Sequence, residues 1–527
     1  MRVLASLLVL MLLSWCSTQA YWTSSQEPLR PRESASFERN CRLFGIVVQD
    51  ISQTVSEYYH FEVIPPTALA GRALLGLYRA ANVEPPEGLA REPDRYLLTQ
   101  PGENLADKLQ LARKVLGEHA LIQGERSIHQ AVHALFQTLD TFSNYAEVDT
   151  QVRNMMENGC GLGLYLEDRL QGGSYFVRHV SRNSVAHKQG IRPGDELLEI
   201  NHAPIPLNTS TGRVNMLMTL NSRQRAGLHL TFRSLEGLQK KLELSAQRQQ
   251  LIESNEIMLF GNDFDQETSV SGYRPLQEDN WEYWVDPVHK IALLRVGAIS
   301  TSVSRFIETV DLLSLNGMKS LILDLRESPI GYPEAAASLA GLFLEKNALI
   351  STTQYRKPTH EDIQLGNNRN EIRSRHEGRR YENLPLVVLT SPETSGAAEM
   401  IASALQDHER AKIVGQRTRG KSTIQQVRGP GNTTSATGLF FSYRLTVGVF
   451  SRPSGKTLNR MPGMTTHDDW GVRPDIEVVL PAQVRRQVRA WWFENDLRPE
   501  DSREPTPLDD LRNDPVLYAA VKLLRKN

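Results

Sequence analysis

The stretch PLVVLTSPETSGAAEMIASALQDHERAKIVGQRTRGKSTIQQ, residues 385–426, decides the fold of the second half of this chain. It begins with an apolar run of strand length, followed by a polar turn that reaches Ser395. From Gly396 onward, apolar residues recur at helical spacing, which predicts a helix with one buried face. A second short strand and a turn that presents Lys421 follow. This order of elements is typical of an α/β sheet with parallel strands.

The turn between the first strand and the helix is the candidate site of chemistry. Such a turn places its residues at the N-terminus of a helix, where unpaired backbone N–H groups and the helix dipole favour developing negative charge. Acyl transfer develops such a charge on the oxygen of the attacked carbonyl. The turn is therefore a suitable place for an acyl-transfer nucleophile.

Polar residues along the same stretch resemble a known motif. The motif of the C-terminal processing (tail-specific) serine peptidases reads roughly S-A-S-A-S-E, then Q-D, then G-K-G-x-x-Q. The resemblance implies a Ser-Lys mechanism in which Lys421 is the general base and Gln425 orients it, while Glu399 and Asp407 have supporting roles. A lysine serves as a base only when it is neutral. The matching positions are Glu399, Asp407, Gly420, Lys421 and Gln425.

The nucleophile position departs from this motif. The family has its serine three places before the glutamate, where this chain has Gly396. The nearest hydroxyl groups belong to Thr394 and Ser395. We expect Ser395 to act as the nucleophile through a one-residue shift of the turn. The alternative for this serine is the N-cap of the helix, a role that serine fills often.

A second departure lies earlier in the chain. The family segment D-L-R-x-N-x-G-G appears here as DLRESPIG, residues 324–331. Ser328 stands at the usual Asn and Ile330 at the first Gly, whereas the second Gly is kept as the supporting residue Gly331. A β-branched side chain restricts the backbone and crowds the approach of a substrate. This departure also lies at an element of the family's active site.

Two hypotheses therefore stay open. In the first, the chain is an exported serine endopeptidase that cleaves with Ser395, Lys421 and Gln425, and backbone N–H groups at the helix start hold the oxyanion. In the second, it is a catalytically inactive relative that acts as a peptide-binding scaffold.

Residues 160–248 resemble a PDZ domain. The run GIRPGDELLEIN, residues 190–201, stands at PDZ spacing after a glycine-containing loop. The resemblance implies that backbone N–H groups of this loop hold the terminal carboxylate of a peptide, which adds to a sheet edge as a strand. The partners would then be protein or peptide substrates bound by their C-terminal tails. The peptide-binding loop consists of Gly161, Leu162, Gly163 and Leu164.

The chain as a whole is expected to be an α/β multidomain protein of the tail-specific protease type. Within its C-terminal part, residues 491–505 are expected to be loose, and a last helix is expected to begin at Asp514 and Pro515. The expected parts are a signal segment (1–20), a flexible lead-in (21–36), a helical N-terminal domain (37–151), the PDZ domain (160–248), an α/β protease-like domain (290–480) and a C-terminal helical tail (481–527).

The N-terminus indicates export to the periplasm or the outside of the cell. Arg2 precedes an apolar run, and a stretch of small residues follows that ends at Ala20, as in a cleaved signal peptide. A lipoprotein signal with Cys16 as the lipidated residue is disfavoured by the bulky Trp15 before it. A retained membrane anchor is disfavoured by the shortness of the apolar run.

Composition and motifs exclude several other classes of function. Sixty basic residues against 61 acidic residues give a net charge of -1, which offers no attraction for nucleic acid or an anionic membrane. Histidines and cysteines lack metal-ligand spacing, and no phosphate or dinucleotide fingerprint occurs, so no cofactor or metal is expected. Cys41 and Cys160 would remain after signal cleavage, either as a disulfide or as two free thiols.

Overall fold

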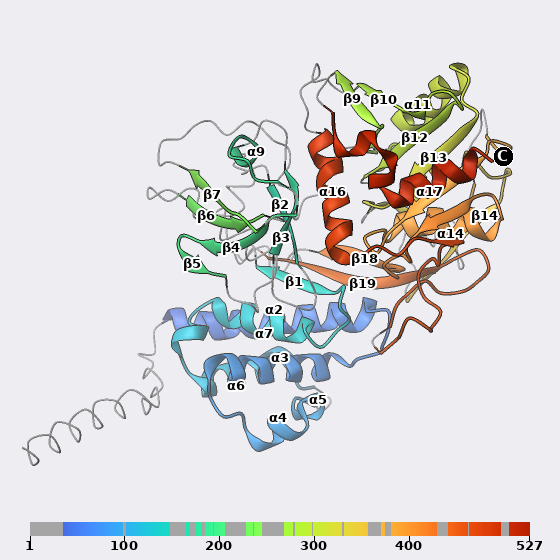
Figure 1. The fold of residues 1–527 in the computed structure, drawn as a ribbon. Helices are drawn as coiled ribbons and strands as arrows, with labels where there is room; N and C mark the ends of the chain where they lie inside the picture. Colours follow the sequence, from blue (N-terminus) through green and yellow to red (C-terminus); the bar gives the residue numbers. More distant parts are fainter. Residues whose placement is uncertain are drawn as a thin grey trace, which may run out of the picture. The chain divides into compact units, whose positions relative to one another are not determined.

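The computed structural model describes most of the chain between residue 35 and residue 526 (Figure 1). The predicted signal segment lies outside the described residues. In the part that is described, no helix is long and apolar enough to cross a membrane. The described residues are 35–98, 102–147, 164–168, 175–180, 185–192, 194–205, 228–234, 237–244, 268–277, 280–297, 299–328, 331–356, 370–374, 381–428, 441–461, 463–496 and 505–526.

The chain divides into two compact units. The first unit contains residues 1–147 and 425–447, and the second contains residues 148–424 and 448–527. Strands β18 (Thr423–Arg428) and β19 (Phe441–Ser451) contribute residues to both units.

The first unit is helical, as predicted for the N-terminal region. In its first helix, Val47, Ile51 and Val55 recur at helical spacing and are fully or almost fully buried. Gly45 lets this helix approach the α6 helix closely, because a Cβ atom there would lie 2.3 Å from the carbonyl oxygen of Ala106. The helices are α2 (Ala35–Tyr58), α3 (Pro66–Ala81), α4 (Glu87–Arg91), α5 (Pro93–Tyr96), α6 (Leu105–Leu116), η1 (Ala120–Ile122) and α7 (Arg126–Phe136).

A short strand closes this unit. Strand β1 (Asn144–Glu147) pairs antiparallel with residues 441–444 of β19. Just before β1, the carboxylate of Asp140 accepts hydrogen bonds from the hydroxyl of Ser143 at 2.6 Å and the hydroxyl of Thr446 at 3.1 Å. Asp140 therefore fixes the start of β1 to its partner strand.

The described residues between 164 and 244 form an antiparallel sheet. The GIRPGDELLEIN run supplies its central strand β4, and Val177, Leu197 and Phe232 are buried in its core. The described elements are β2 (Leu164–Asp168), β3 (Tyr175–Val180), α9 (Val185–Lys188), β4 (Glu196–Ile200), β5 (Ala203–Pro204), β6 (Leu228–Arg233) and β7 (Gln239–Leu244).

A seven-stranded sheet forms the centre of the second unit. Its order is β11-β12-β13-β16-β17-β20, and β8 pairs with β12. Strands β12, β13, β16, β17 and β20 run parallel, as predicted from the alternation of strands and helices. The strands are β8 (Val270–Ser271), β11 (Trp284–Asp286), β12 (Ile291–Val296), β13 (Ser320–Asp324), β16 (Leu386–Thr390), β17 (Lys412–Gly415) and β20 (Ile476–Glu477).

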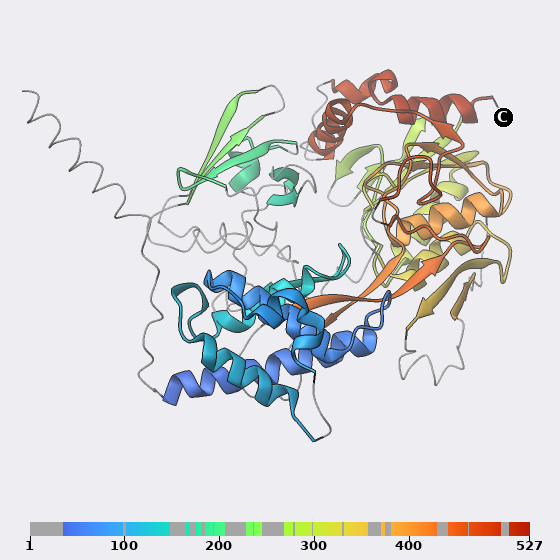
Figure 2. The same cartoon turned by 90° about the horizontal axis from the view of Figure 1, so that it is seen from below.

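Helices cover both faces of this sheet (Figures 1 and 2). Successive residues of a strand point to opposite faces. Accordingly, Val388 packs in the core with α11, α12 and α14, while Val387 and Leu389 pack in the core with α16 and α17. The helices are α11 (Ser304–Leu315), α12 (Pro333–Gly341), α14 (Ala397–Asp407), α16 (Ala482–Asp496) and α17 (Pro515–Leu524).

The C-terminal part contains one correction. Residues 491–496, predicted to be loose, belong to helix α16. The prediction was wrong there because charged residues dominate this segment and only a few apolar residues mark its buried face. Two of them, Val488 and Trp492, lie one helical turn apart and pack against the sheet. The predicted start of the last helix at Asp514 and Pro515 is confirmed, with Asp514 as its N-cap.

The remaining strands form smaller pairings in the second unit. Strand β14 pairs antiparallel with residues 448–451 of β19 and with β15. Strands β9 and β10 form a separate antiparallel pair. The bounds are β9 (Arg274–Gln277), β10 (Asn280–Glu282), β14 (Leu349–Tyr355) and β15 (Asn370–Arg373), and the single turns η2 (Pro507–Asp509) and η3 (Leu511–Asn513) precede α17.

The packing of α17 on the sheet gives the first prediction. Leu517 is fully buried, whereas its neighbour Tyr518 is 39% exposed. We expect Leu517→Ala to lower the free energy of unfolding by about 2–5 kcal/mol, because it leaves a cavity against the sheet. Tyr518→Ala is the control and should cost much less. Urea denaturation of both variants measures the difference, and equal losses would contradict the assigned orientation of the helix.

Candidate functional site

The candidate site lies where three neighbouring parallel strands end. Strands β13, β16 and β17 end at Asp324, Thr390 and Gly415, and their parallel pairing puts the following turns at one edge of the sheet. In open α/β sheets, this carboxyl edge is where ligands bind. We call these turns the first turn (residues 325–328), the second turn (391–396) and the third turn (416–421).

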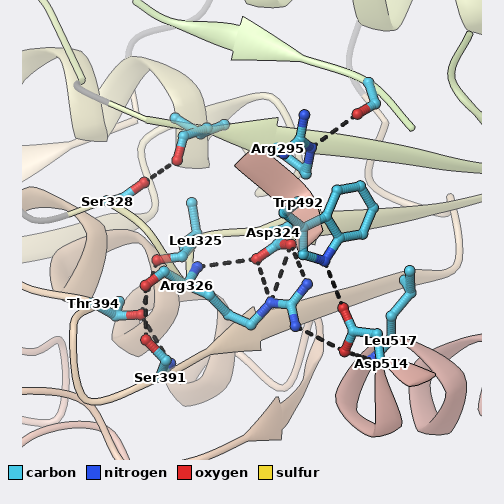
Figure 3. Close-up of polar contacts among 12 residues, drawn as sticks. Arg295, Asp324, Leu325, Arg326, Ser328, Ser391, Thr394, Trp492, Asp514 and Leu517 are labelled. Atoms are coloured by element: carbon cyan, nitrogen blue, oxygen red, sulfur yellow. Dashed lines mark hydrogen bonds and ion pairs between the residues drawn. The ribbon is translucent and has the colours of Figure 1, made fainter. Parts of the chain in front are cut away.

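Hydroxyl groups join the second turn to the first. Within the second turn, the amide N–H of Ser391 donates to Thr394 Oγ1 at 3.0 Å. The hydroxyl of Thr394 in turn donates to the carbonyl oxygen of Leu325 at 2.8 Å. These contacts are drawn in Figure 3. The polar residues that follow β16 are therefore used to hold the turn in place.

Ser395 belongs to the second turn and lies buried against the first turn. Its amide N–H donates to the carbonyl oxygen of Ser328 at 3.0 Å, and only 1% of the residue is exposed. The N-cap of α14 is Gly396, so the alternative role of Ser395 as the N-cap is wrong. In this conformation, a substrate would not reach the Ser395 hydroxyl.

Gly396 has a backbone conformation that requires glycine. Its φ is 63° and its ψ is −121°, a combination that an L side chain adopts only with strain. A Cβ atom built on Gly396 would meet no atom of the described residues within 4 Å. Pro329 and Ile330 lie outside the described residues. The position that the motif assigns to the nucleophile thus has no side chain, although described neighbours leave room for one.

Glu399 joins the helix start to the third turn. Its Oε2 atom accepts from the amide of Gly396 at 3.1 Å and from the amide of Lys421 at 2.8 Å. Its Oε1 atom accepts from the amide of Gly420 at 2.7 Å and from the hydroxyl of Thr418. Because the first two bonds end on one oxygen atom, the backbones of Gly396 and Lys421 lie side by side.

The Glu399 carboxylate is fully buried. Burial raises the pKa of this carboxyl above its ordinary value, and its four hydrogen bonds oppose the shift. Such a buried acceptor is costly to leave unpaired, so each of the four donors is held firmly. Glu399 therefore fixes the backbone of the third turn, and its supporting role in catalysis stays a prediction.

Further contacts position Lys421. The amide of Arg419 donates to the carbonyl oxygen of Thr394 at 2.9 Å, which joins the third turn to the second. Gly420, with φ of 78°, packs so closely on Trp470 that a Cβ atom would lie 2.8 Å from its ring. The side chain of Lys421 is half-buried. The backbone of the candidate base is therefore fixed from two sides.

The other predicted site residues lie in several different elements. Gln425 lies in β18, where its side-chain amide is 3.4 Å from Thr446 Oγ1. Gly331 lies beside the start of α14, since a Cβ atom there would be 2.8 Å from the Cβ of Ala397. Gly161, Leu162 and Gly163 lie outside the described residues, and Leu164 begins β2.

Asp407 lies at the far end of α14. The helix has 11 residues, which corresponds to roughly 16 Å at 1.5 Å per residue. The Asp407 carboxylate accepts from Nε of Arg452 at 3.0 Å and from the amide of Ser454 at 2.9 Å. Although burial disfavours the charged form, these bonds hold the pKa of Asp407 below its ordinary value. Asp407 therefore anchors the chain after β19 and does not reach the second turn.

Sequence reasoning missed Arg326 and Thr418. Both contribute side-chain or backbone contacts to the three turns. Thr418 lies between two arginines, a setting typical of an exposed residue, and the DLR match at residues 324–326 assigns Arg326 no role in the site. The hydroxyl residues Ser391 and Thr394 could have been found, because Ser and Thr after a strand often bond to nearby backbone.

Two features bear on metal binding and thiol chemistry in the described part of the chain. Among the described residues, no group of three or more His, Cys, Asp or Glu side chains could hold a metal ion. Cys41 is a buried free thiol, and burial raises its pKa to about 11. Cys160 lies outside the described residues.

Comparisons with known proteins identify two families. Residues 290–478 match the model of peptidase family S41, and residues 151–231 match the PDZ domain. The carboxy-terminal processing protease CtpA of Bacillus subtilis is 22% identical over 388 residues, covering 72% of this chain and 70% of the relative. The carboxy-terminal-processing protease of Bartonella bacilliformis is 24% identical over 362 residues, covering 68% and 70%.

Solved structures also match. The photosystem II D1 C-terminal processing protease aligns over 85% of this chain and 97% of its own, with a TM-score of 0.47 and 17% sequence identity.

The ion pair of Asp407 with Arg452 predicts that stability depends on pH. The pKa of Asp407 is lower in the folded state than in the unfolded chain, where an aspartate has a pKa of about 4. Its contribution to the free energy of unfolding is therefore fully present at pH values above the unfolded pKa. The contribution is lost as the pH falls through the pKa of the folded state. We expect Asp407→Asn to cost about 2 kcal/mol near pH 7 and progressively less in acid. The control is Asp469→Asn. Asp469 forms an ion pair with Lys456, and its side chain is 59% exposed. Denaturation at several pH values tests this, and a constant loss would contradict it.

The Glu399 contacts give another prediction. Glu399→Gln turns one acceptor atom into a donor that faces backbone N–H groups or the Thr418 hydroxyl. Each buried donor left unpaired should lower the free energy of unfolding by about 1–3 kcal/mol. We expect faster hydrogen exchange at the amides of Gly420 and Lys421. Glu409→Gln, at an exposed position just beyond the same helix, should leave these rates unchanged. Unchanged exchange in Glu399→Gln would contradict the role given to this carboxylate.

Proposed function

The chain belongs to the C-terminal processing peptidases, with an S41 domain and a PDZ domain, and from this we propose that it is an exported serine-type endopeptidase acting on protein C-terminal tails. The observation that carries the proposal is the contact of one Glu399 oxygen with the amides of both Gly396 and Lys421. A base and a nucleophile must be held within reach of the same proton. This contact keeps the candidate base beside the start of α14.

In the proposed mechanism, Ser395 attacks the carbonyl carbon of the scissile peptide bond. Lys421, in its neutral form, takes the hydroxyl proton, and Gln425 orients the lysine. Backbone N–H groups in the first turn of α14 stabilise the oxyanion. Because Ser395 is 1% exposed, the second turn must open when substrate binds. Gly396 is the point at which the backbone can rotate to allow this opening.

Substrate capture is assigned to the PDZ domain. Its loop of residues 161–164 is proposed to hold the terminal carboxylate of a protein tail, while the tail adds to a sheet edge as a strand. Export is proposed from the signal-like N-terminus, which would place the enzyme among secreted or periplasmic substrates.

A second candidate function is the capture of tails without cleavage. It is favoured by Gly396, which leaves the motif's nucleophile position without a hydroxyl, and by the burial of Ser395. The two candidates share the binding step and differ only in whether a peptide bond is broken.

The deciding experiment uses the chain without residues 1–20 and an unfolded protein with an apolar C-terminus as substrate. We expect cleavage by the wild type and a loss of at least about 100-fold in kcat/KM in Ser395→Ala and in Lys421→Ala. Lys412→Ala is the matched control, because the Lys412 side chain is 67% exposed at the start of β17. Mass spectrometry of the products measures the rate and the cleavage position.

The same preparation decides between the two candidates. Tail binding is measured with a fluorescent peptide that carries either a free or an amidated C-terminus, and Gly163→Asp should abolish it. A wild type that binds tails but does not cleave, and that gains cleavage in Gly396→Ser, would favour capture alone. Cleavage that survives in Ser395→Ala would overturn the choice of nucleophile.

A further inference from the structure

The C-terminal helices contact the candidate site through a buried charge cluster. The guanidinium of Arg326 lies between two carboxylates (Figure 3), with Nε 2.9 Å from Asp324 Oδ1 and a terminal nitrogen 2.9 Å from Asp514 Oδ1. Asp514 is fully buried. It also accepts from the amide of Leu517 at 3.1 Å and from the indole N–H of Trp492 at 2.8 Å. Helices α16 and α17 therefore share one carboxylate with the end of β13.

Arg326 belongs to the first turn, to which the second turn is hydrogen-bonded. The carbonyl oxygen of Arg326 accepts from the Ser391 hydroxyl at 2.7 Å, next to the bond from Thr394 to Leu325. Two residues later, the carbonyl oxygen of Ser328 accepts from the amide of Ser395. A displacement of Arg326 would therefore be transmitted to the backbone around Ser395.

Helix α16 makes two further ion pairs with the same turns. Arg489 Nε lies 3.0 Å from a carboxylate oxygen of Glu327 in the first turn. Arg485 Nε lies 3.6 Å from a carboxylate oxygen of Glu393 in the second turn. Residues four apart lie on the same face of a helix. One face of α16 thus contacts both turns.

We propose that helices α16 and α17 are a positioning element of the candidate site. Asp514 holds the first turn through Arg326, while Arg489 and Arg485 hold the first and second turns to a common helix. Together they hold the second turn against the first turn, which keeps Ser395 buried, and they set how readily the second turn opens. The role of Ser395 in this statement rests on the proposed function, but the coupling of the helices to the turn does not.

The test measures the opening of the second turn without using activity. Ser395→Cys introduces a thiol at the buried position, in a background with Cys160→Ser. Its reaction rate with DTNB, followed by mass spectrometry of the labelled peptides, reports how often the turn opens. The buried thiol of Cys41 serves in the same molecule as the monitor of unfolding in the other unit.

We expect Asp514→Asn to raise the labelling rate at position 395 at least tenfold, with Arg489→Gln and Arg485→Gln raising it by smaller factors. The matched control is Arg525→Gln, which breaks an ion pair of 2.6 Å with Asp286 just beyond the other end of α17. This control should leave the rate at position 395 within twofold. The rate at Cys41 should not change in any variant.

Two outcomes would overturn the proposal. One is a labelling rate in Asp514→Asn and Arg489→Gln no higher than in Arg525→Gln. The other is a parallel rise at position 395 and at Cys41, which would indicate general unfolding. If Asp514→Asn does not fold, the two arginine variants decide alone. Failure of the proposed peptidase activity leaves this test intact. Where activity is present, Asp514→Asn in the Ser395 enzyme should raise kcat/KM, because the second turn must open before substrate can bind.

Discussion

The candidate site depends on one buried carboxylate. Glu399 lies in the first turn of α14 and accepts four hydrogen bonds, which come from the start of its own helix and from the third turn. A buried charge is tolerated only when its hydrogen-bonding capacity is filled. The third turn must therefore keep the one conformation that presents its amides to Glu399. That requirement fixes the backbone of Lys421.

The parallel sheet makes this arrangement possible. Because β13, β16 and β17 run in the same direction, their following turns meet at one edge, where hydroxyl and amide groups bond across from turn to turn. Helix α14 covers one face of the sheet, while α16 and α17 cover the other. The edge is thus supported from both sides, and the charge cluster of Asp324, Arg326 and Asp514 links it to the end of the chain.

The chain belongs to the processing peptidases but departs from their motif at the nucleophile position. Gly396 adopts a conformation suited to glycine, and Ser395 beside it is buried. A scaffold of this kind can keep a peptide-binding role when the nucleophile is absent, because binding and bond cleavage use different groups. Under the proposed function, cleavage follows when the second turn opens. The two possibilities share every contact described for Glu399.

The sequence by itself determined the strand, helix and strand order of residues 385–426, the parallel sheet, the PDZ run and the absence of a side chain at Gly396. These features follow from local periodicity and from residue identity, which need no knowledge of distant contacts. Tertiary structure decided the burial of Ser395, the four donors of Glu399, the place of Asp407 beside Arg452 and the helical state of residues 491–496. Each of these depends on packing or pairing with distant segments. Arg326 and Asp514, 188 residues apart, meet only because the sheet and its covering helices bring them together.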